Sequence, residues 1–297
     1  MQEIASLSRT RKIIKKYNLK LKKSLGQNFL INANILQKII KAAKVDQTTN
    51  VLEIGPGIGA LTEYLARTSH QVLAFEIDQR MLPVLTETLN PYKNVTIINQ
   101  DILKIDLKQE ISKFFADHSF KVVANLPYYV TTPIIMHLIK SKLDIEQMVI
   151  MIQKEVGERI SAKPGSKVYG SLSIAVQYFM KAHIIFAVPK TVFIPKPNVD
   201  SVILSLTKHR APAVLVKNEK AFFYLIKASF AKRRKTLWNN LVYAYGKEQK
   251  IQNKLINALE SSKIDPKRRA ETLTIQEFVT LSNAIFALFS FMWITNL

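Results

Sequence analysis

VLEIGPGIG, residues 51–59, is the stretch that decides the fold. It starts as a short apolar run, typical of a strand buried on both faces, and continues directly into three alternating glycines. Glycines at this spacing let the backbone turn sharply and approach a ligand closely, and the helix predicted over 60–67 offers free N–H groups there. The segment therefore predicts a ligand-binding turn between a strand and a helix, although such a turn can also be purely structural.

Working outward from this segment, short apolar runs alternate with helical patterns. The runs predict strands over 51–54, 72–77, 94–99, 121–125 and 148–152, and helices between them over 60–67, 79–89 and 131–141. This alternation predicts an α/β domain. Three closely spaced runs follow at 171–179, 183–188 and 201–207, and we expect them to end the sheet as antiparallel strands.

The periodicity changes after Lys208. Apolar residues then recur at helical spacing over 217–231, 234–245, 248–261 and 274–289, which predicts a small helical domain. We expect a basic N-terminal arm over 1–23, an α/β domain over 24–208, a helical domain over 209–289 and an apolar tail over 290–297. The uncharged stretch 281–297 is slightly short for a membrane span, so it is interpreted as a helix that continues into the tail, with membrane contact as the alternative.

Composition limits the class of protein. The chain has 43 Lys+Arg against 22 Asp+Glu, a formal net charge of +21, which favours a polyanionic partner such as nucleic acid or an anionic membrane. It contains no Cys, which excludes disulfides, thiolate metal sites and cysteine nucleophiles and suits a reducing cytoplasm. The five His are scattered without metal-ligand spacing, so no metal site is predicted.

Two acids follow the second and third predicted strands. Glu76 lies 21 positions after Gly55, where a carboxylate can accept both hydroxyls of a ribose, and Asp101 lies where it can reach an adenine amino group. Singly, each acid is more often a solvated strand end or a helix cap. Together with the glycine turn they predict an adenosine-containing cofactor. Both NAD and S-adenosylmethionine fit, and the close Gly-x-Gly-x-Gly spacing favours the second.

The fourth strand ends in Asn125-Leu126-Pro127-Tyr128. Adenine's exocyclic amine is a poor nucleophile, because its lone pair is delocalised into the ring. The Asn125 side-chain oxygen and a backbone carbonyl made prominent by Pro127 would accept its two N–H bonds and free that lone pair. Tyr128 would stack on the extruded base, and Phe193 in the loop FIPKPNVDS would supply a second aromatic, unless it simply plugs the core.

These motifs together resemble the ribosomal RNA adenine N6,N6-dimethyltransferase family. The resemblance covers nearly the whole chain and includes LGQNFL (25–30), 53–59, 125–128, YGSLS (169–173) and 193–201. The likeness is closest to the bacterial small-subunit branch. Erm-type enzymes, which modify large-subunit rRNA, share most motifs, but Leu126, the 169–173 run and the 23-residue lead favour the small-subunit branch.

The resemblance implies a Rossmann-like class I methyltransferase domain with a small C-terminal all-α domain, and S-adenosylmethionine as the cofactor. Asn28 and Leu30 would line its site from the N-terminal side, Gly55 would contact the methionine part, Glu76 the ribose and Asp101 the adenine. The expected cofactor site comprises Asn28, Leu30, Gly55, Gly57, Glu76, Ile77, Asp101, Ile102 and Asn125. The expected catalytic residues are Asn125, Leu126, Pro127, Tyr128 and Phe193.

The resemblance also implies the substrate. The family dimethylates two adjacent adenosines in a hairpin near the 3′ end of small-subunit rRNA, late in subunit assembly, so the small ribosomal subunit is the expected partner of a cytoplasmic monomer with no membrane association. Basic clusters would position the RNA without reading bases, although solvated helix ends are the default interpretation. The expected RNA-binding residues are Arg11, Lys22, Lys23, Lys232, Arg233, Arg234, Lys235 and Arg268.

Three other functions remain open on the sequence. One is an assembly factor that binds immature subunits, with catalysis secondary or lost. Another is a DNA adenine methyltransferase, for which the helical domain looks too short to read the major groove. The last is a nicotinamide oxidoreductase, which would leave residues 125–128 without a role and lacks a proton-relay candidate.

Overall fold

The computed structural model describes residues 3–21, 26–116, 118–209 and 215–289. The described parts of Met1–Gly157 and Lys181–Lys208 form one compact unit, and those of Glu158–Met180 and His209–Leu297 form a second. The sequence assigned 158–180 to the α/β domain, whereas the structure groups these residues with the helical unit. The chain therefore leaves the first unit twice, after Gly157 and after Lys208.

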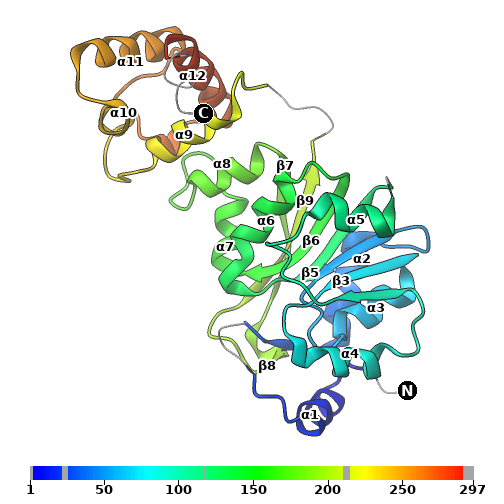
Figure 1. Ribbon diagram of the computed structural model, residues 1–297. Coiled ribbons are helices and arrows are strands. Elements are labelled where there is room, and N and C mark those ends of the chain that lie inside the picture. Colours follow the sequence, from blue (N-terminus) through cyan, green and yellow to red (C-terminus); the bar gives the residue numbers. More distant parts are fainter. Residues whose placement is uncertain (1–2, 22–25, 117, 210–214, 290–297) are drawn as a thin grey trace. The chain divides into compact units, whose positions relative to one another are not determined.

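A seven-stranded sheet is the centre of the first unit (Figure 1). Its order is β4-β3-β2-β5-β6-β9-β7. β2 pairs in parallel with both β3 and β5, and β9 runs antiparallel to β6. The carboxyl ends of the parallel strands consequently share one edge, where ligands bind in such sheets. The strands are β2 (Asn50–Ile54), β3 (Gln71–Phe75), β4 (Val95–Ile98), β5 (Phe120–Asn125), β6 (Ile145–Gln153), β7 (Met180–Val188) and β9 (Ser201–Lys208).

The predicted strands over 51–54, 72–77, 94–99, 121–125 and 148–152 are all confirmed as β2 to β6. Central side chains such as Leu52 and Val122 are completely buried, which explains why these strands appear as continuous apolar runs. Helices precede, connect and follow these strands, and four of them were not predicted: α1, α2, α5 and α7. The helices of this part of the chain are α1 (Leu7–Lys16), α2 (Ala33–Ala43), α3 (Ala60–Thr68), α4 (Leu82–Leu89), α5 (Leu107–Phe115), α6 (Thr131–Lys140) and α7 (Lys154–Ile160), with 3₁₀ turns η2 (Gln79–Met81) and η3 (Tyr128–Val130).

The N-terminal arm contains a helix rather than being frayed throughout. α1 begins after the N-cap Ser6, whose side chain accepts a hydrogen bond from the Arg9 N–H. Ile4 and Ile13 are buried in the core of the first unit. The dense bases of this stretch hid the apolar face that makes it amphipathic, because the sequence was interpreted by its charge.

A short second sheet joins two distant segments. β1 (Phe29–Leu30) pairs antiparallel with β8 (Phe193–Ile194), and the Ile31 N–H donates to the Val192 carbonyl at 2.9 Å. β8 follows a 3₁₀ turn, η4 (Lys190–Val192). This pairing brings the LGQNFL motif and the FIPKPNVDS loop together, although 163 residues separate Leu30 from Phe193.

The second unit is helical where it is described. The four helices predicted after Lys208 are confirmed, but the strand predicted over 171–179 is wrong. Ser171–Gln177 is a helix, α8, whose Ser173 hydroxyl accepts from the Gly170 N–H at 3.0 Å and donates to the Arg159 carbonyl. An apolar run this short does not distinguish a strand from a buried helix. The other helices are α9 (Glu219–Ser229), α10 (Leu237–Tyr245), α11 (Gln249–Ser261) and α12 (Ile275–Leu288), with the turn η5 (Ala270–Thr272).

Within the described ranges, no helix is both long enough and apolar enough to cross a membrane. The predicted tail 290–297 lies outside these ranges.

Candidate active site

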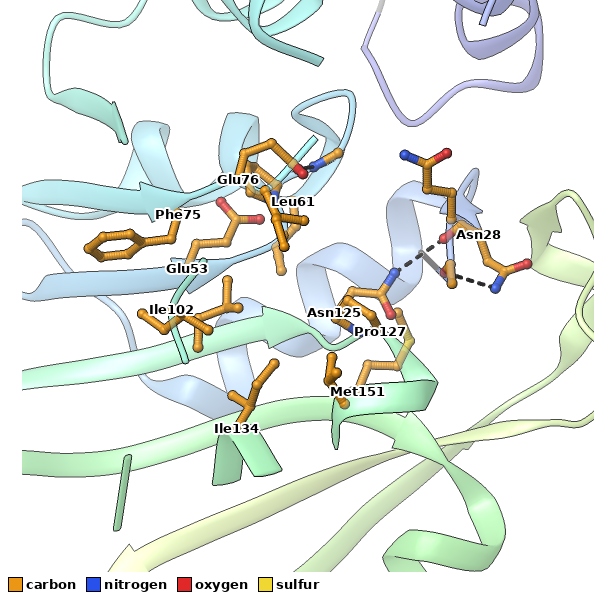
Figure 2. A pocket seen from close by; sticks show the side chains of 18 of the residues that line it. Asn28, Glu53, Leu61, Phe75, Glu76, Ile102, Asn125, Pro127, Ile134 and Met151 are labelled. Carbon is orange, nitrogen blue, oxygen red and sulfur yellow. Dashed lines mark hydrogen bonds between the residues drawn. The ribbon is translucent and has the colours of Figure 1, made fainter. Parts of the chain in front are cut away.

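A cavity of about 240 Å³ opens at the carboxyl ends of β2, β3, β4 and β5 (Figure 2). All nine residues of the expected cofactor site line it. These are Asn28, Leu30, Gly55, Gly57, Glu76, Ile77, Asp101, Ile102 and Asn125, and Pro127 of the expected catalytic set lines it too. Side chains from five separate stretches of sequence thus converge on one space, as the parallel sheet predicts.

The glycine turn forms one wall and requires glycine for two reasons. Gly55 and Gly57 have positive φ angles of 71° and 58°, where other residues are strained. A Cβ added at Gly57 would lie 3.0 Å from the Phe29 ring, so the Phe29 side chain, which belongs to the LGQNFL motif, packs directly on the turn. The backbone can therefore approach a ligand closely here.

Glu76 is held by backbone amides beside this turn. Its carboxylate accepts from the Gly57 N–H at 3.1 Å and from the Asp78 N–H at 2.8 Å. Burial raises the pKa of Glu76, while these hydrogen bonds act in the opposite direction. Asp101 is more open and accepts from the Leu103 N–H at 3.0 Å. Both acids thus present fixed oxygens to the cavity.

Glu53 also lines the cavity, and sequence reasoning assigned it no role. It is 1% exposed, and its Oε2 has no hydrogen-bond partner among the described residues. Burial raises its pKa to about 8, and the charge of Glu76 acts in the same direction. Such a carboxyl group is costly unless a ligand partners it, so the cavity fits a molecule with a cationic group. The signal for this role in the sequence was an acid within the apolar run of the first predicted strand, 51–54.

The Asn125 amide is anchored on the N-terminal wall. Its Nδ2 donates to the Asn28 carbonyl at 3.3 Å, as Figure 2 shows, and its Oδ1 accepts no hydrogen bond from the described part of the chain. The Pro127 carbonyl accepts from the Val130 N–H at 3.2 Å and from Thr131 Oγ1 at 3.0 Å. The Leu126 carbonyl accepts none of the hydrogen bonds found in the described ranges. The two acceptors left for a substrate amine are therefore Asn125 Oδ1 and the Leu126 carbonyl.

Three expected catalytic side chains do not line the cavity. Leu126 is 1% exposed and Phe193 is 3% exposed. Phe193 packs in the core of the first unit, which is the structural alternative given for it in the sequence analysis. Tyr128 is partly buried, and its hydroxyl hydrogen-bonds Ser201 Oγ at 2.7 Å. Tyr128 and Phe193 thus come from segments that meet near the cavity, while their roles toward a base stay predictions.

Tyr129 is the aromatic that sequence reasoning missed. It lines the cavity and is 51% exposed. Partial burial raises the pKa of its hydroxyl, and the charges of Asp101 and Glu76, which line the same cavity, add to this. The signal was the second Tyr of a consecutive pair, but a sequence does not tell which of two neighbours faces a cavity.

The expected RNA-binding residues differ in what they contact. Lys22 and Lys23 lie outside the described residues, and Arg11 is exposed on α1. Residues 232–235 are exposed in the second unit; the Lys232 ammonium lies 3.6 Å from the Tyr243 ring centroid, and the Arg233 guanidinium contacts Glu271.

Arg268 is not a free cation. Its guanidinium pairs with Glu277 and donates to the Thr272 carbonyl at 2.7 Å. Glu277 in turn accepts from the Thr274 N–H in the capping box of α12. The contacts of Arg268 are therefore internal to the helical unit. No group of His and acids in the described ranges is arranged to hold a metal.

Comparison with known proteins identifies relatives along almost the whole chain. The family model described as ribosomal RNA adenine dimethylase matches residues 18–285. The ribosomal RNA small subunit methyltransferase A of Enterococcus faecalis is 59% identical over 285 residues, covering 96% of this chain and 97% of that protein. The protein of the same name from Anoxybacillus flavithermus is 56% identical over 291 residues, covering 97% and 98%.

Solved structures support the same assignment. A dimethyladenosine transferase from Plasmodium falciparum matches with a TM-score of 0.71 and 28% identity, over 85% of this chain and 95% of that chain. The 23S rRNA methyltransferase ErmE matches with a TM-score of 0.66 and 21% identity, over 86% of this chain and 98% of its own, which shows the shared fold alone. The predicted Rossmann-like class I methyltransferase fold with a helical C-terminal part is thus confirmed. On this evidence, the chain belongs to the ribosomal RNA adenine dimethylase family of methyltransferases.

Proposed function

We propose that this chain transfers methyl groups from S-adenosylmethionine to the N6 amines of two adjacent adenosines in a hairpin near the 3′ end of small-subunit rRNA, during subunit biogenesis in the cytoplasm. The names of its relatives support this branch, because those at 53–59% identity are small-subunit methyltransferases. The single observation that carries the chemistry is the cavity itself, where Asn125, whose Oδ1 accepts no hydrogen bond from the described residues, lies beside the glycine turn and three acids.

The residues of the cavity fit the cofactor by charge. S-adenosylmethionine supplies an activated methyl group and carries a sulfonium and an ammonium. It therefore offers a cation to Glu53, whose Oε2 has no hydrogen-bond partner among the described residues. Gly55 and Gly57 would allow close approach of its methionine part, Glu76 would bind the ribose and Asp101 the adenine amino group. Ile77 and Ile102, which both line the cavity, would contact the apolar faces of the adenine.

Asn125 and Leu126 would prepare the target amine. Asn125 Oδ1 and the Leu126 carbonyl would accept its two N–H bonds, which pulls the nitrogen toward tetrahedral geometry and makes its lone pair available. The anchor from Asn125 Nδ2 to the Asn28 carbonyl fixes which end of the amide points to the substrate. Pro127 restricts the preceding residue to extended conformations and so stiffens the loop.

Tyr128 and Phe193 would hold the target base between their rings. Ser201 restrains the Tyr128 ring by its hydroxyl, at the start of β9. Phe193 would have to become accessible, because it is 3% exposed in this structure. The exposed bases among Lys232, Arg233, Arg234 and Lys235 would dock the rRNA of the small subunit without reading its bases, with the protein acting as a monomer.

The deciding experiment measures methyl transfer from labelled S-adenosylmethionine to unmethylated immature small subunits, with large subunits and naked DNA in parallel. We expect N6,N6-dimethyladenosine in small-subunit RNA alone. Label in large-subunit RNA would assign the chain to the Erm-type activity, and label in DNA to a DNA methyltransferase. Subunit binding without any transfer would support the assembly-factor alternative.

A further inference from the structure

The outer face of α1 carries an unusual concentration of charge. Arg11, Lys12 and Lys15 are all exposed, and at 3.6 residues per turn they occupy an arc of about 100° on one side of the helix. No ion pair or side-chain hydrogen bond within the described residues involves any of the three. Nothing on this face competes for them, so their charge is directed to solvent.

The inner face of the same helix is fully occupied. Ile13 is buried in the core of the first unit, as are Ile4 and Ala5 just before the helix, and the completely buried Thr10 donates its hydroxyl to the Ile4 carbonyl at 3.0 Å. The Tyr17 hydroxyl, just after the helix, donates to the Pro83 carbonyl on α4. α1 is therefore an integral part of the first unit, beside α4 in Figure 1.

Two other bases of α1 are paired with acids of neighbouring helices. Arg9 lies 3.9 Å from the carboxylate of Glu63, a residue of α3 that is 3% exposed and also accepts from the Ile4 N–H at 2.8 Å. Lys16 pairs with Glu87 of α4 at 2.5 Å. Two charges of α1 are thus paired with acids, that of the partly buried Arg9 and that of the exposed Lys16. Arg11, Lys12 and Lys15 are exposed and have no such partner among the described residues.

From this difference we infer that the outer face of α1 is a phosphate-binding surface for rRNA, separate from the target-base site. The inference rests on the proposed function for the identity of the RNA. Because α1 is packed on the core, the backbone that carries the three cations is ordered before RNA arrives, and binding loses little backbone entropy. Cations alone, without flanking base-reading groups, position a nucleic acid rather than specify a sequence.

An anionic membrane is the competing partner for a basic amphipathic helix, and the packing argues against it. Interfacial helices bind by burying an apolar face among the lipids in addition to their charges. The apolar face of α1 is already buried against the protein, so only the electrostatic attraction would remain. Phosphates of a folded RNA require nothing more than that attraction.

The test is a triple neutralisation, Arg11→Gln, Lys12→Gln and Lys15→Gln, at three exposed positions whose side chains take no part in the packing. We expect the affinity for immature small subunits to fall at least 10-fold at 0.1 M salt, and the slope of log affinity against log salt to become shallower by about 2, since each RNA phosphate contact contributes about 0.7 to 0.9. The Kd for S-adenosylmethionine and kcat at saturating subunits stay at the wild-type values.

A matched control removes the same charge elsewhere on the first unit, by Lys41→Gln, Lys108→Gln and Lys142→Gln, which are also exposed. We expect its salt slope to stay within about 0.5 of wild type. Equal slopes for the two triple variants would mean that only net charge matters and would overturn the inference. A second result would also overturn the inference. If wild type binds phosphatidylserine vesicles, and if the α1 variant loses this binding but keeps the wild-type affinity for subunits, then α1 is a membrane-binding surface.

These outcomes separate the inference from the function on which it rests. If wild type fails to methylate small-subunit RNA, the proposed function is wrong, whatever the α1 variant does. If wild type methylates it and the α1 variant keeps the wild-type salt slope, the inference alone is wrong. A circular-dichroism melt of both variants confirms that a changed slope does not reflect unfolding.

Discussion

The cavity of the first unit and the basic cluster 232–235 of the second unit are built on opposite principles. In the cavity, polar groups such as Glu53 and Glu76 are buried, and their orientation is imposed by the backbone. In the cluster, the charged groups are exposed, and Lys232 and Arg233 contact a neighbouring ring and an acid. The electrostatic interactions of a buried polar group are strong because little water surrounds it, whereas those of an exposed charge are screened by water and salt. Single changes should therefore be severe in the cavity and modest in the cluster.

The largest effect is expected from Asn125→Ala. The variant loses the side-chain acceptor for the amine, so kcat should fall about 10²- to 10³-fold, as for the loss of one oriented group at a reacting centre. Single-turnover methyl transfer to immature subunits measures this, and calorimetric titration should show a Kd for S-adenosylmethionine within about 5-fold of wild type. A kcat within 3-fold of wild type would show that the Leu126 carbonyl suffices. Normal growth and subunit maturation with an inactive variant would favour the assembly-factor alternative.

Glu53→Gln tests whether the buried acid serves the cofactor. With its pKa raised to about 8 in the folded state, ionisation of Glu53 is disfavoured there, so it lowers wild-type stability as pH rises from about 4.5 to about 8. We expect the cofactor-free variant to be more stable than wild type at pH 8 and to lose this part of the pH dependence in thermal melts. Its Kd for S-adenosylmethionine at pH 8 should rise about 10-fold, because a neutral amide replaces the carboxylate near the cation.

Asp46→Asn provides a control of opposite sign. Hydrogen bonds from the side chain and N–H of Thr48 lower the pKa of Asp46 to about 2, so its contribution to stability is present above about pH 4 and is lost as pH falls toward 2. Asp46 does not line the cavity. A change of cofactor affinity in this variant as large as that in Glu53→Gln would show that the effect at Glu53 is not local.

A smaller effect is expected when Lys232, Arg234 and Lys235 are replaced by Gln. Affinity for immature subunits should fall about 5-fold at 0.1 M salt with a shallower salt dependence, because exposed phosphate contacts are individually weak. Cofactor affinity should not change. Filter binding across a salt series measures both quantities. An unchanged rRNA affinity would remove the cluster from the proposed RNA surface.

The smallest effect on RNA is expected from Arg268→Ala. Its pairing with Glu277 is internal to the helical unit, so the variant should lose about 1 kcal/mol of stability while rRNA affinity stays within 2-fold of wild type. Urea unfolding and filter binding distinguish the two outcomes. A loss of affinity with unchanged stability would restore Arg268 to the expected RNA-binding set. It would also show that a cation paired with an acid can still bind RNA, which the contrast between the cavity and the exposed cluster does not predict.

The cavity of the first unit was largely predictable from the sequence. Residues 51–59 and 125–128 lie at ends of strands that are buried on both faces, and such strands are recognised by their unbroken apolar runs. Once those strands are assigned, the rules of parallel sheets bring their carboxyl ends to one edge, so Glu76, Asp101 and Asn125 were expected to converge. Their chemistry follows from residue type and needs no tertiary information.

Prediction from the sequence failed where the secondary structure is decided by contacts with residues more distant in the chain. The run 171–179 has a pattern shared by strands and short helices, and α8 is fixed by side-chain bonds to the carbonyls of Arg159, Ile160 and Ala162. Segment 158–180 belongs to the helical unit because Ala162, Tyr169 and Ile174 pack in its core with residues of α9 to α12. In the N-terminal stretch, eight bases concealed an amphipathic helix.

The sequence by itself determined the fold class, the family resemblance and the residue types at the strand ends, because these depend on local pattern and spacing. Only the tertiary structure decided that Glu53 is buried with an Oε2 that has no hydrogen-bond partner among the described residues, that Tyr129 rather than Tyr128 lines the cavity, and that Phe193 is enclosed in the core. It also decided which bases of α1 pair with acids and which have no acid partner among the described residues. Burial and pairing depend on segments far apart in the chain, and desolvation, which sets the strength of every one of these charges, exists only after those segments have packed.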